Sequence, residues 1–157
     1  MTLIYNENGN KVWSATLAET LEWELPFTSQ PYPCLIYACR EADSQCMTEV
    51  GRQLITSGCV FIVCAGADCE RWHDAIDSEI VAAQVKGSLD AEKMIMTTWH
   101  SRDSLEEFVF FFTHNTFDAN AEAHPGFGEA LDSNYVVLLI GDERPKLLEH
   151  IVESLRS

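Results

Sequence analysis

The sequence is poor in positive charge. Its 157 residues include 10 Lys and Arg against 25 Asp and Glu, which gives a formal net charge of −15. A field of this sign repels phosphate backbones and anionic lipid surfaces, so we expect neither nucleic acid nor a membrane as a ligand. The same field attracts basic protein partners, and it also keeps an acidic protein soluble.

Long apolar runs are missing as well. No stretch approaches the roughly 20 apolar residues that a membrane-spanning helix needs. The first residues, MTLIYNENGNKVW, lack the basic and apolar regions of an export signal. We therefore predict a cytoplasmic protein whose six cysteines are reduced thiols rather than a disulfide framework.

Motifs of strong specificity are also absent. The sequence contains no G-x-G-x-x-G, Walker loop, G-x-S-x-G or H-E-x-x-H, the signatures of common nucleotide-binding, hydrolase and metalloprotease sites. One polar stretch carries His114, Asp118 and His124, whose spacing matches no metal motif. The sequence thus predicts no metal site and identifies no cofactor.

Four short apolar runs are present, and a helical pattern follows each of them. The runs are CLIYAC (34–39), CVFIVC (59–64), MIMTTW (94–99) and YVVLLI (135–140). Continuous apolar runs are typical of parallel strands that are buried on both faces. We predict an α/β fold, a three-layer sandwich with a mainly parallel sheet of about four βα units in a flavodoxin- or Rossmann-like arrangement.

Capping residues mark where the helices begin. Asp43, Asp68 and Asp142 each stand between a strand and a helical pattern, where an N-cap is expected. Ser104 and Glu107 have the spacing of a capping box. These positions give the polar residues after each strand a structural role to weigh against a functional one.

The first 30 residues follow a different pattern. Asn8-Gly9 between two apolar stretches predicts a β-hairpin. SATLAETLEW (14–23) has two leucines four residues apart behind a serine, which predicts a short helix. We expect a single domain over 1–157, with a hairpin or helix extension in 1–30 and the α/β core in 33–156.

Four cysteines are predicted to be core residues. Cys34 and Cys39, like Cys59 and Cys64, have the four intervening residues of some zinc-ligand pairs. Each pair spans a strand, however, and residues five apart on a strand point to opposite faces. Free cysteine is also among the most buried residue types, so we predict core packing for all four.

Cys69 and His73 are the first candidates for chemistry. They lie one turn apart at the start of the second helix, where the helix dipole favours a thiolate. A thiol within reach of an imidazole is the minimum for nucleophilic catalysis. In the structural alternative, Asp68 caps the helix, Cys69 packs and His73 lies at the rim of the apolar stripe, because the surrounding carboxylates disfavour a thiolate.

A second set of candidates follows from the fold class. Ligands of open parallel sheets bind outside the carboxyl ends of the strands. Polar or aromatic side chains follow those ends here and would suit a polar ligand; the candidates are Arg40, Asp68, Trp99 and Arg102. His100 lies in the same region without a capping role, and it joins Cys69 and His73 as a catalytic candidate.

The segment FVFFF (108–112) is apolar nearly all round. Such a helix is either deeply buried or half of a subunit interface. We therefore consider self-association through Phe108, Phe111 and Phe112, beside binding to a basic protein partner.

Two segments carry a resemblance. DCERWHDAID (68–77) and MTTWHSRDSLEE (96–107) resemble a small bacterial family of unknown function with a Cys-Glu-x-x-His-Asp helix start and a later Thr-Trp-His. The resemblance covers roughly residues 33 to 156 and implies no activity. The strand–helix rhythm is also similar to Toll/interleukin-receptor-type signalling domains, although we do not place that family's loop motifs or catalytic glutamate in this sequence.

Two functions follow from these patterns. The absent catalytic motifs, the acidic charge and the apolar FVFFF segment predict a non-enzymatic protein-interaction or regulatory module. The alternative is an enzyme, or a domain that binds a small ligand or a metal, with a site at the carboxyl edge of the sheet that uses His73 and His100.

Overall fold

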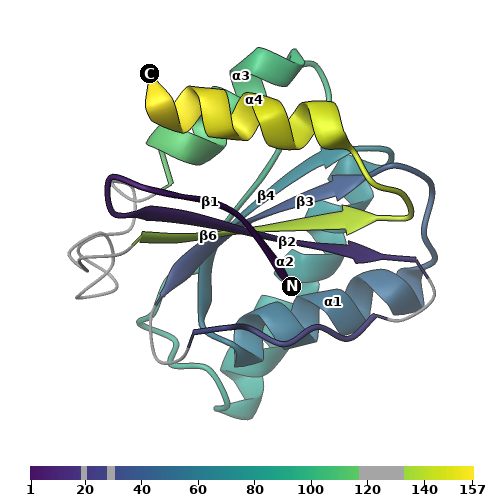
Figure 1. Cartoon of the computed structure of the whole chain (residues 1–157). Coiled ribbons are helices and arrows are strands. Elements are labelled where there is room, and N and C mark those ends of the chain that lie inside the picture. The colour runs from purple at the N-terminus through teal and green to yellow at the C-terminus, as the bar shows by residue number, and fades with distance from the viewer. Residues whose placement is uncertain (19–20, 28–30, 117–132) are drawn as a thin grey trace.

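The computed structural model describes residues 1–18, 21–27, 31–116 and 133–157 (Figure 1). Within these residues the strands are β1 (Thr2–Glu7), β2 (Asn10–Leu17), β3 (Tyr32–Ala38), β4 (Cys59–Gly66), β5 (Met96–Trp99) and β6 (Ser133–Ile140). The helices are α1 (Ser44–Thr56), α2 (Cys69–Lys86), α3 (Leu105–His114) and α4 (Pro145–Arg156). The four predicted apolar strands and the helix after each of them are therefore present.

The strands form one mixed sheet in the order β1-β2-β6-β3-β4-β5. All neighbours are parallel except β1 and β2. From β3 the chain moves outward through β4 to β5 and then returns to place β6 on the other side of β3. Because right-handed crossovers in opposite directions put their helices on opposite faces, α1 and α2 cover one face and α3 and α4 the other (Figure 1).

The N-terminal hairpin is confirmed, and it extends the sheet. Asn8 and Gly9 have φ angles of 54° and 77°, the left-handed pair of a tight hairpin turn. The helix predicted for 14–23 is wrong, because β2 runs on to Leu17 and pairs with β6 as far as Ile140. The backbone hydrogen bonds of this parallel ladder outweigh the weak local preference for helix.

Residues 21–27 cross the α1/α2 face without forming a helix. The apolar side chains of this segment, Trp23, Leu25 and Phe27, pack against the core on that face. The Gln53 side chain of α1 donates a hydrogen bond of 2.6 Å to the backbone carbonyl of Leu21. The segment thus covers part of the face that the α2 and α1 helices leave open.

Of the four helix caps predicted from the sequence, two are confirmed and two are wrong. The Asp43 side chain accepts from the Cys46 N–H at 2.8 Å, and Ser104 forms the predicted capping box. Asp68 occupies the N-cap position of α2, but its φ angle is 53° and its carboxylate pairs with Arg71 at 3.1 Å instead of capping. In α4 the N-cap position belongs to Arg144, so Asp142 is not a cap.

Three of the four predicted core thiols are in the core. Cys34, Cys59 and Cys64 are at most 1% exposed, whereas Cys39 is half-buried and donates its S–H to the carbonyl of Asp142 at 3.2 Å. Core packing is therefore wrong for Cys39, which lies beyond the end of β3.

The face assignment of Cys59 and Cys64 also needs correction. Both side chains belong to the core under α1 and α2 rather than to opposite faces. The register explains this, because Tyr32 pairs with Cys59 while the next residue, Pro33, pairs with Phe61. β4 therefore has one extra residue, Val60, between these two pairs, which is a β-bulge. The extra residue shifts by one position which side chains of β4 point to each face of the sheet.

The FVFFF segment is largely internal. Phe108 and Phe112 of α3 are 5% and 0% exposed in the core of the α3/α4 face, and Phe111 packs edge-on against Phe61 at 5.9 Å. Phe108 and Phe112 are therefore buried within the fold, and Phe111 is half-buried. Phe110 is the exposed member of the segment, with 58% of its surface accessible. Self-association itself stays a prediction.

Candidate functional site

The carboxyl edge between β3 and β6, where the strand order reverses, is bridged by hydrogen bonds of the chain itself. The Cys39 N–H donates to the Ile140 carbonyl, and the Gly141 N–H donates to the Leu17 carbonyl. The Arg40 guanidinium reaches across and donates to the Ala18 carbonyl at 3.1 Å. Arg40 also lies on Gly141, where an added Cβ would come within 2.9 Å of its Cγ. Arg40 therefore ties three strand ends together.

His73 and Trp99 meet on the α2 side of β5. Their ring centroids are 4.5 Å apart, and 45% of Trp99 is exposed. His73 Nδ1 lies 3.0 Å from a carboxylate oxygen of Asp74, and its Nε2 lies 3.8 Å from Asp77. Asp77 in turn accepts a hydrogen bond of 2.7 Å from the Thr97 hydroxyl. The result is an acidic, partly aromatic corner.

Cys69 does not join this corner. Its side chain is 3% exposed in the core of the α1/α2 face. Among the hydrogen bonds of the described residues, none links Cys69 to His73, and Asp68 is occupied by Arg71. The Cys-His pair predicted from the sequence is therefore not assembled as a nucleophile and its base.

His100 lies on the other face of the same strand end. Its Nδ1 is 2.6 Å from a carboxylate oxygen of Asp103, and its Nε2 is 3.0 Å from the Thr98 hydroxyl. The ring packs against Phe111 of α3 with a centroid distance of 4.8 Å. The backbone N–H of His100 donates to the Cys64 carbonyl, which fixes the residue to β4.

The strand alternation of β5 separates the two histidines. Thr97 and Trp99 face α2 and its His73, whereas Thr98 and His100 face α3. Successive side chains of a strand point to opposite faces, so the two imidazoles belong to different faces of the sheet. Arg102 is exposed in the loop that follows.

Burial makes the core thiols unreactive. Desolvation raises the pKa of Cys34, Cys59 and Cys64 well above the ordinary value of 9.0, because a thiolate has no water or cation to stabilise it there. Nowhere in the described segments do three His, Cys, Asp or Glu side chains group so that they could hold a metal ion. Asp118 and His124 lie outside those segments.

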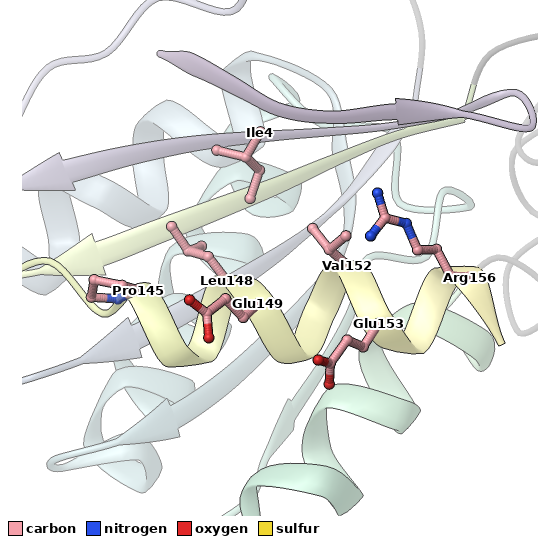
Figure 2. Close-up of a pocket in the computed structure, with 7 residues that line it drawn as sticks. All are labelled: Ile4, Pro145, Leu148, Glu149, Val152, Glu153 and Arg156. Carbon is pink, nitrogen blue, oxygen red and sulfur yellow. The ribbon is translucent and has the colours of Figure 1, made fainter.

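A groove that the sequence did not predict runs between β1 and α4. It consists of two adjoining hollows of about 370 Å³ and 530 Å³, which share Ile4, Pro145 and Leu148. Figure 2 shows Ile4 pointing from β1 toward Leu148 and Val152 on α4. These apolar side chains are half-buried. We call this feature the β1–α4 groove.

The rim of the β1–α4 groove is acidic. Glu149, Glu153 and one cationic side chain, Arg156, line the first hollow (Figure 2). Glu22 and Glu143 line the second hollow. The Arg156 guanidinium is already engaged, since it donates to Glu7 at 3.0 Å and lies 5.6 Å from the Tyr5 ring centroid. The hydrogen bond and charge of Glu7 raise the pKa of Arg156 above its ordinary value. The rim therefore presents net negative charge over an apolar floor.

The groove was missed because its parts are far apart in the sequence. On α4, Ile151 is fully buried. Leu148 and Val152 are only half-buried, because β1 lies at the sheet edge and covers them incompletely. Only the position of β1, which strand order decides, makes a groove from these residues.

None of the helices in the described segments has the length and apolar character to cross a membrane.

Comparison with known proteins gives a family without an assigned activity. No curated protein matches the chain. A family model described as "Domain of unknown function (DUF7684)" matches residues 14–156, which is most of the chain and includes the end of β2 ahead of the predicted core. The protein therefore belongs to the DUF7684 family.

Proposed function

We propose that this protein is an interaction module that binds a basic, partly apolar segment of a partner protein in the β1–α4 groove. The observation that carries the proposal is the combination of an apolar floor at Ile4, Leu148 and Val152 with an acidic rim. The formal net charge of −15 acts in the same direction, because it steers a basic partner toward the protein.

The two parts of the groove have different roles in this proposal. Half-buried apolar side chains supply anchoring contacts, and burying them fully against a partner removes more apolar surface from water. The rim carboxylates favour a partner segment with positive charge, and they raise the rate of association rather than supplying most of the affinity. Binding is therefore expected to weaken as ionic strength rises.

The alternative function, an enzyme or ligand-binding domain that uses His73 and His100 together, has less support. The two side chains lie on opposite faces of β5, and Arg40 reaches across the strand reversal at which doubly wound, Rossmann-like sheets bind their ligands.

The groove is tested with a fluorescent peptide of alternating leucine and lysine, titrated into the protein at low and at high salt. We expect saturable binding that a leucine–glutamate peptide does not reproduce. The double variant Glu149→Lys/Glu153→Lys is expected to weaken binding roughly tenfold, because two rim attractions become repulsions.

A matched control separates the groove from bulk charge. Glu49 and Glu70 are exposed on α1 and α2, on the other face of the sheet. The variant Glu49→Lys/Glu70→Lys makes the same change in net charge and should leave the affinity within about twofold. Equal weakening in the two double variants would mean that the peptide senses only the overall charge, and the groove proposal would fail.

A further inference from the structure

His100 is held at both ring nitrogens. Asp103 Oδ2 lies 2.6 Å from Nδ1, and the Thr98 hydroxyl lies 3.0 Å from Nε2. The imidazole side chain is 9% exposed, and the Phe111 ring packs against it. The ring is therefore fixed in position and orientation by three side chains.

The partners decide how the neutral ring carries its proton. A carboxylate only accepts hydrogen bonds, so Nδ1 carries the hydrogen that is donated to Asp103. Nε2 then has its lone pair free and accepts from the Thr98 hydroxyl. A hydroxyl whose proton points at an imidazole, which a carboxylate in turn orients, is the arrangement of an activated nucleophile.

We propose that Thr98, His100 and Asp103 form a relay that transfers acyl groups from activated esters to the Thr98 hydroxyl and on to water. Thr98 is the nucleophile, His100 the general base, and Asp103 a positioning residue. This activity goes beyond the proposed interaction and does not depend on it, because β5 and β1 are the opposite edges of the sheet.

The reaction balances with water as the only co-reactant. Thr98 Oγ1 forms a bond to the acyl carbon while its proton passes to His100 Nε2, and the bond from that carbon to the leaving oxygen breaks. The leaving oxygen departs with the bond electrons and takes the proton from Nε2. A water molecule then attacks the acyl-Thr98 carbon, its proton passes through Nε2 to Oγ1, and a carboxylic acid leaves.

The surroundings of the relay agree with this chemistry. Thr98 is half-buried on β5, which is an edge strand of the sheet within the described residues. The Asp103 side chain is 39% exposed. Helix α3 begins two residues after Asp103. The N-terminus of a helix favours negative charge nearby, which suits the Asp103 carboxylate.

The test uses p-nitrophenyl acetate with the full-length protein and mass spectrometry of tryptic peptides. Trypsin releases residues 94–102, MIMTTWHSR, which include both Thr97 and Thr98. We expect acetylation of this peptide at Thr98, with release of nitrophenolate. Thr98→Val should abolish it, and Thr97→Val should leave it unchanged because the Thr97 hydroxyl bonds Asp77 on the other face.

Two further variants test the roles. His100→Asn keeps a donor for Asp103 but lacks the base, so acetylation should slow roughly 10²-fold. Asp103→Asn should slow acetylation while the label stays on Thr98. If Thr98→Val does not fold, Thr98→Ser serves instead and should keep the label on residue 98. An unlabelled 94–102 peptide in a wild type that releases nitrophenolate no faster than Thr98→Val, or equal labelling in Thr98→Val, would overturn the proposal.

Discussion

The two faces of the sheet bury apolar cores of different chemistry. The face under α1 and α2 carries thiols, with Cys34, Cys59 and Cys64 in the core. The face under α3 and α4 carries aromatic rings such as Phe108 and Phe112, together with the open β1–α4 groove. The α1/α2 face has an extended segment, residues 21–27, packed over it, whereas on the other face the edge strand β1 covers Leu148 and Val152 of α4 incompletely. A face that ends at a short hairpin is left with room for a partner.

The histidines extend this comparison to the end of β5. His73 belongs to the α1/α2 face and packs against the exposed ring of Trp99, whereas His100 packs against Phe111 on the α3/α4 face. Two residues that look equivalent in a sequence motif thus have different surroundings. Proximity along the chain predicts a shared site poorly when the residues alternate on a strand.

The largest effect is expected in the aromatic core of the α3/α4 face. Phe112→Ala should lower the free energy of unfolding by about 4 kcal/mol, because a fully buried ring is lost and a cavity remains. Phe110, two residues earlier in the same helix, is 58% exposed, so Phe110→Ala should change the free energy of unfolding by less than about 1 kcal/mol. Urea denaturation checks both, and similar losses would contradict the placement of α3.

The thiols make the α1/α2 face sensitive to alkaline pH. The folded state keeps Cys34, Cys59 and Cys64 protonated, whereas the unfolded chain releases these protons near the ordinary pKa of 9.0. The unfolded state then binds fewer protons, so stability falls as pH rises above 9.0, by about 1.4 kcal/mol per pH unit for each thiol. Urea denaturation at several pH values measures this slope.

Cys64→Ala sharpens the alkaline prediction. The variant should be less stable at neutral pH. Above pH 9.0 its stability should fall less steeply than that of the wild type, by the about 1.4 kcal/mol per pH unit that one thiol contributes. An unchanged slope would mean that Cys64 ionises as readily in the folded protein as in the unfolded chain.

The smallest effects concern the two histidines. His100→Ala should cost about 2 kcal/mol, because it leaves Asp103 and Thr98 without their partner in a mostly buried place. His73→Ala should cost about 1 kcal/mol or less, since its carboxylate partners are exposed. The losses in the double variant should add within about 0.5 kcal/mol, because the residues share no partner. A larger deviation would indicate that the two faces are coupled here.

Much of the fold followed from local sequence patterns. Each of the apolar runs at 34–39, 59–64, 94–99 and 135–140 contains most of a strand or lies within one, and the Asn8-Gly9 turn is a hairpin, because burial and turn stereochemistry are local properties. The helix expected at 14–23 failed for a non-local reason, since β6, more than 100 residues later, pairs with this segment.

The candidate site was less predictable than the fold. Arg40, Trp99 and His100 do lie at the carboxyl edge of the sheet, as the fold class indicated. Which of them face each other depends on strand alternation and on the bulge in β4, and no local pattern marks either. The β1–α4 groove depends on strand order as well, and a single sequence does not contain that order in readable form.

The most direct measurement is an amide NMR titration of the ¹⁵N-labelled protein with the leucine–lysine peptide at low salt. If the β1–α4 groove binds basic segments, the resonances of Ile4, Leu148 and Val152 shift together and saturate with one affinity, and Glu149→Lys/Glu153→Lys reduces those shifts. Shifts that instead follow the acidic surface of α1 and α2, or that leave Ile4 and Leu148 unmoved, would contradict a binding function for the groove.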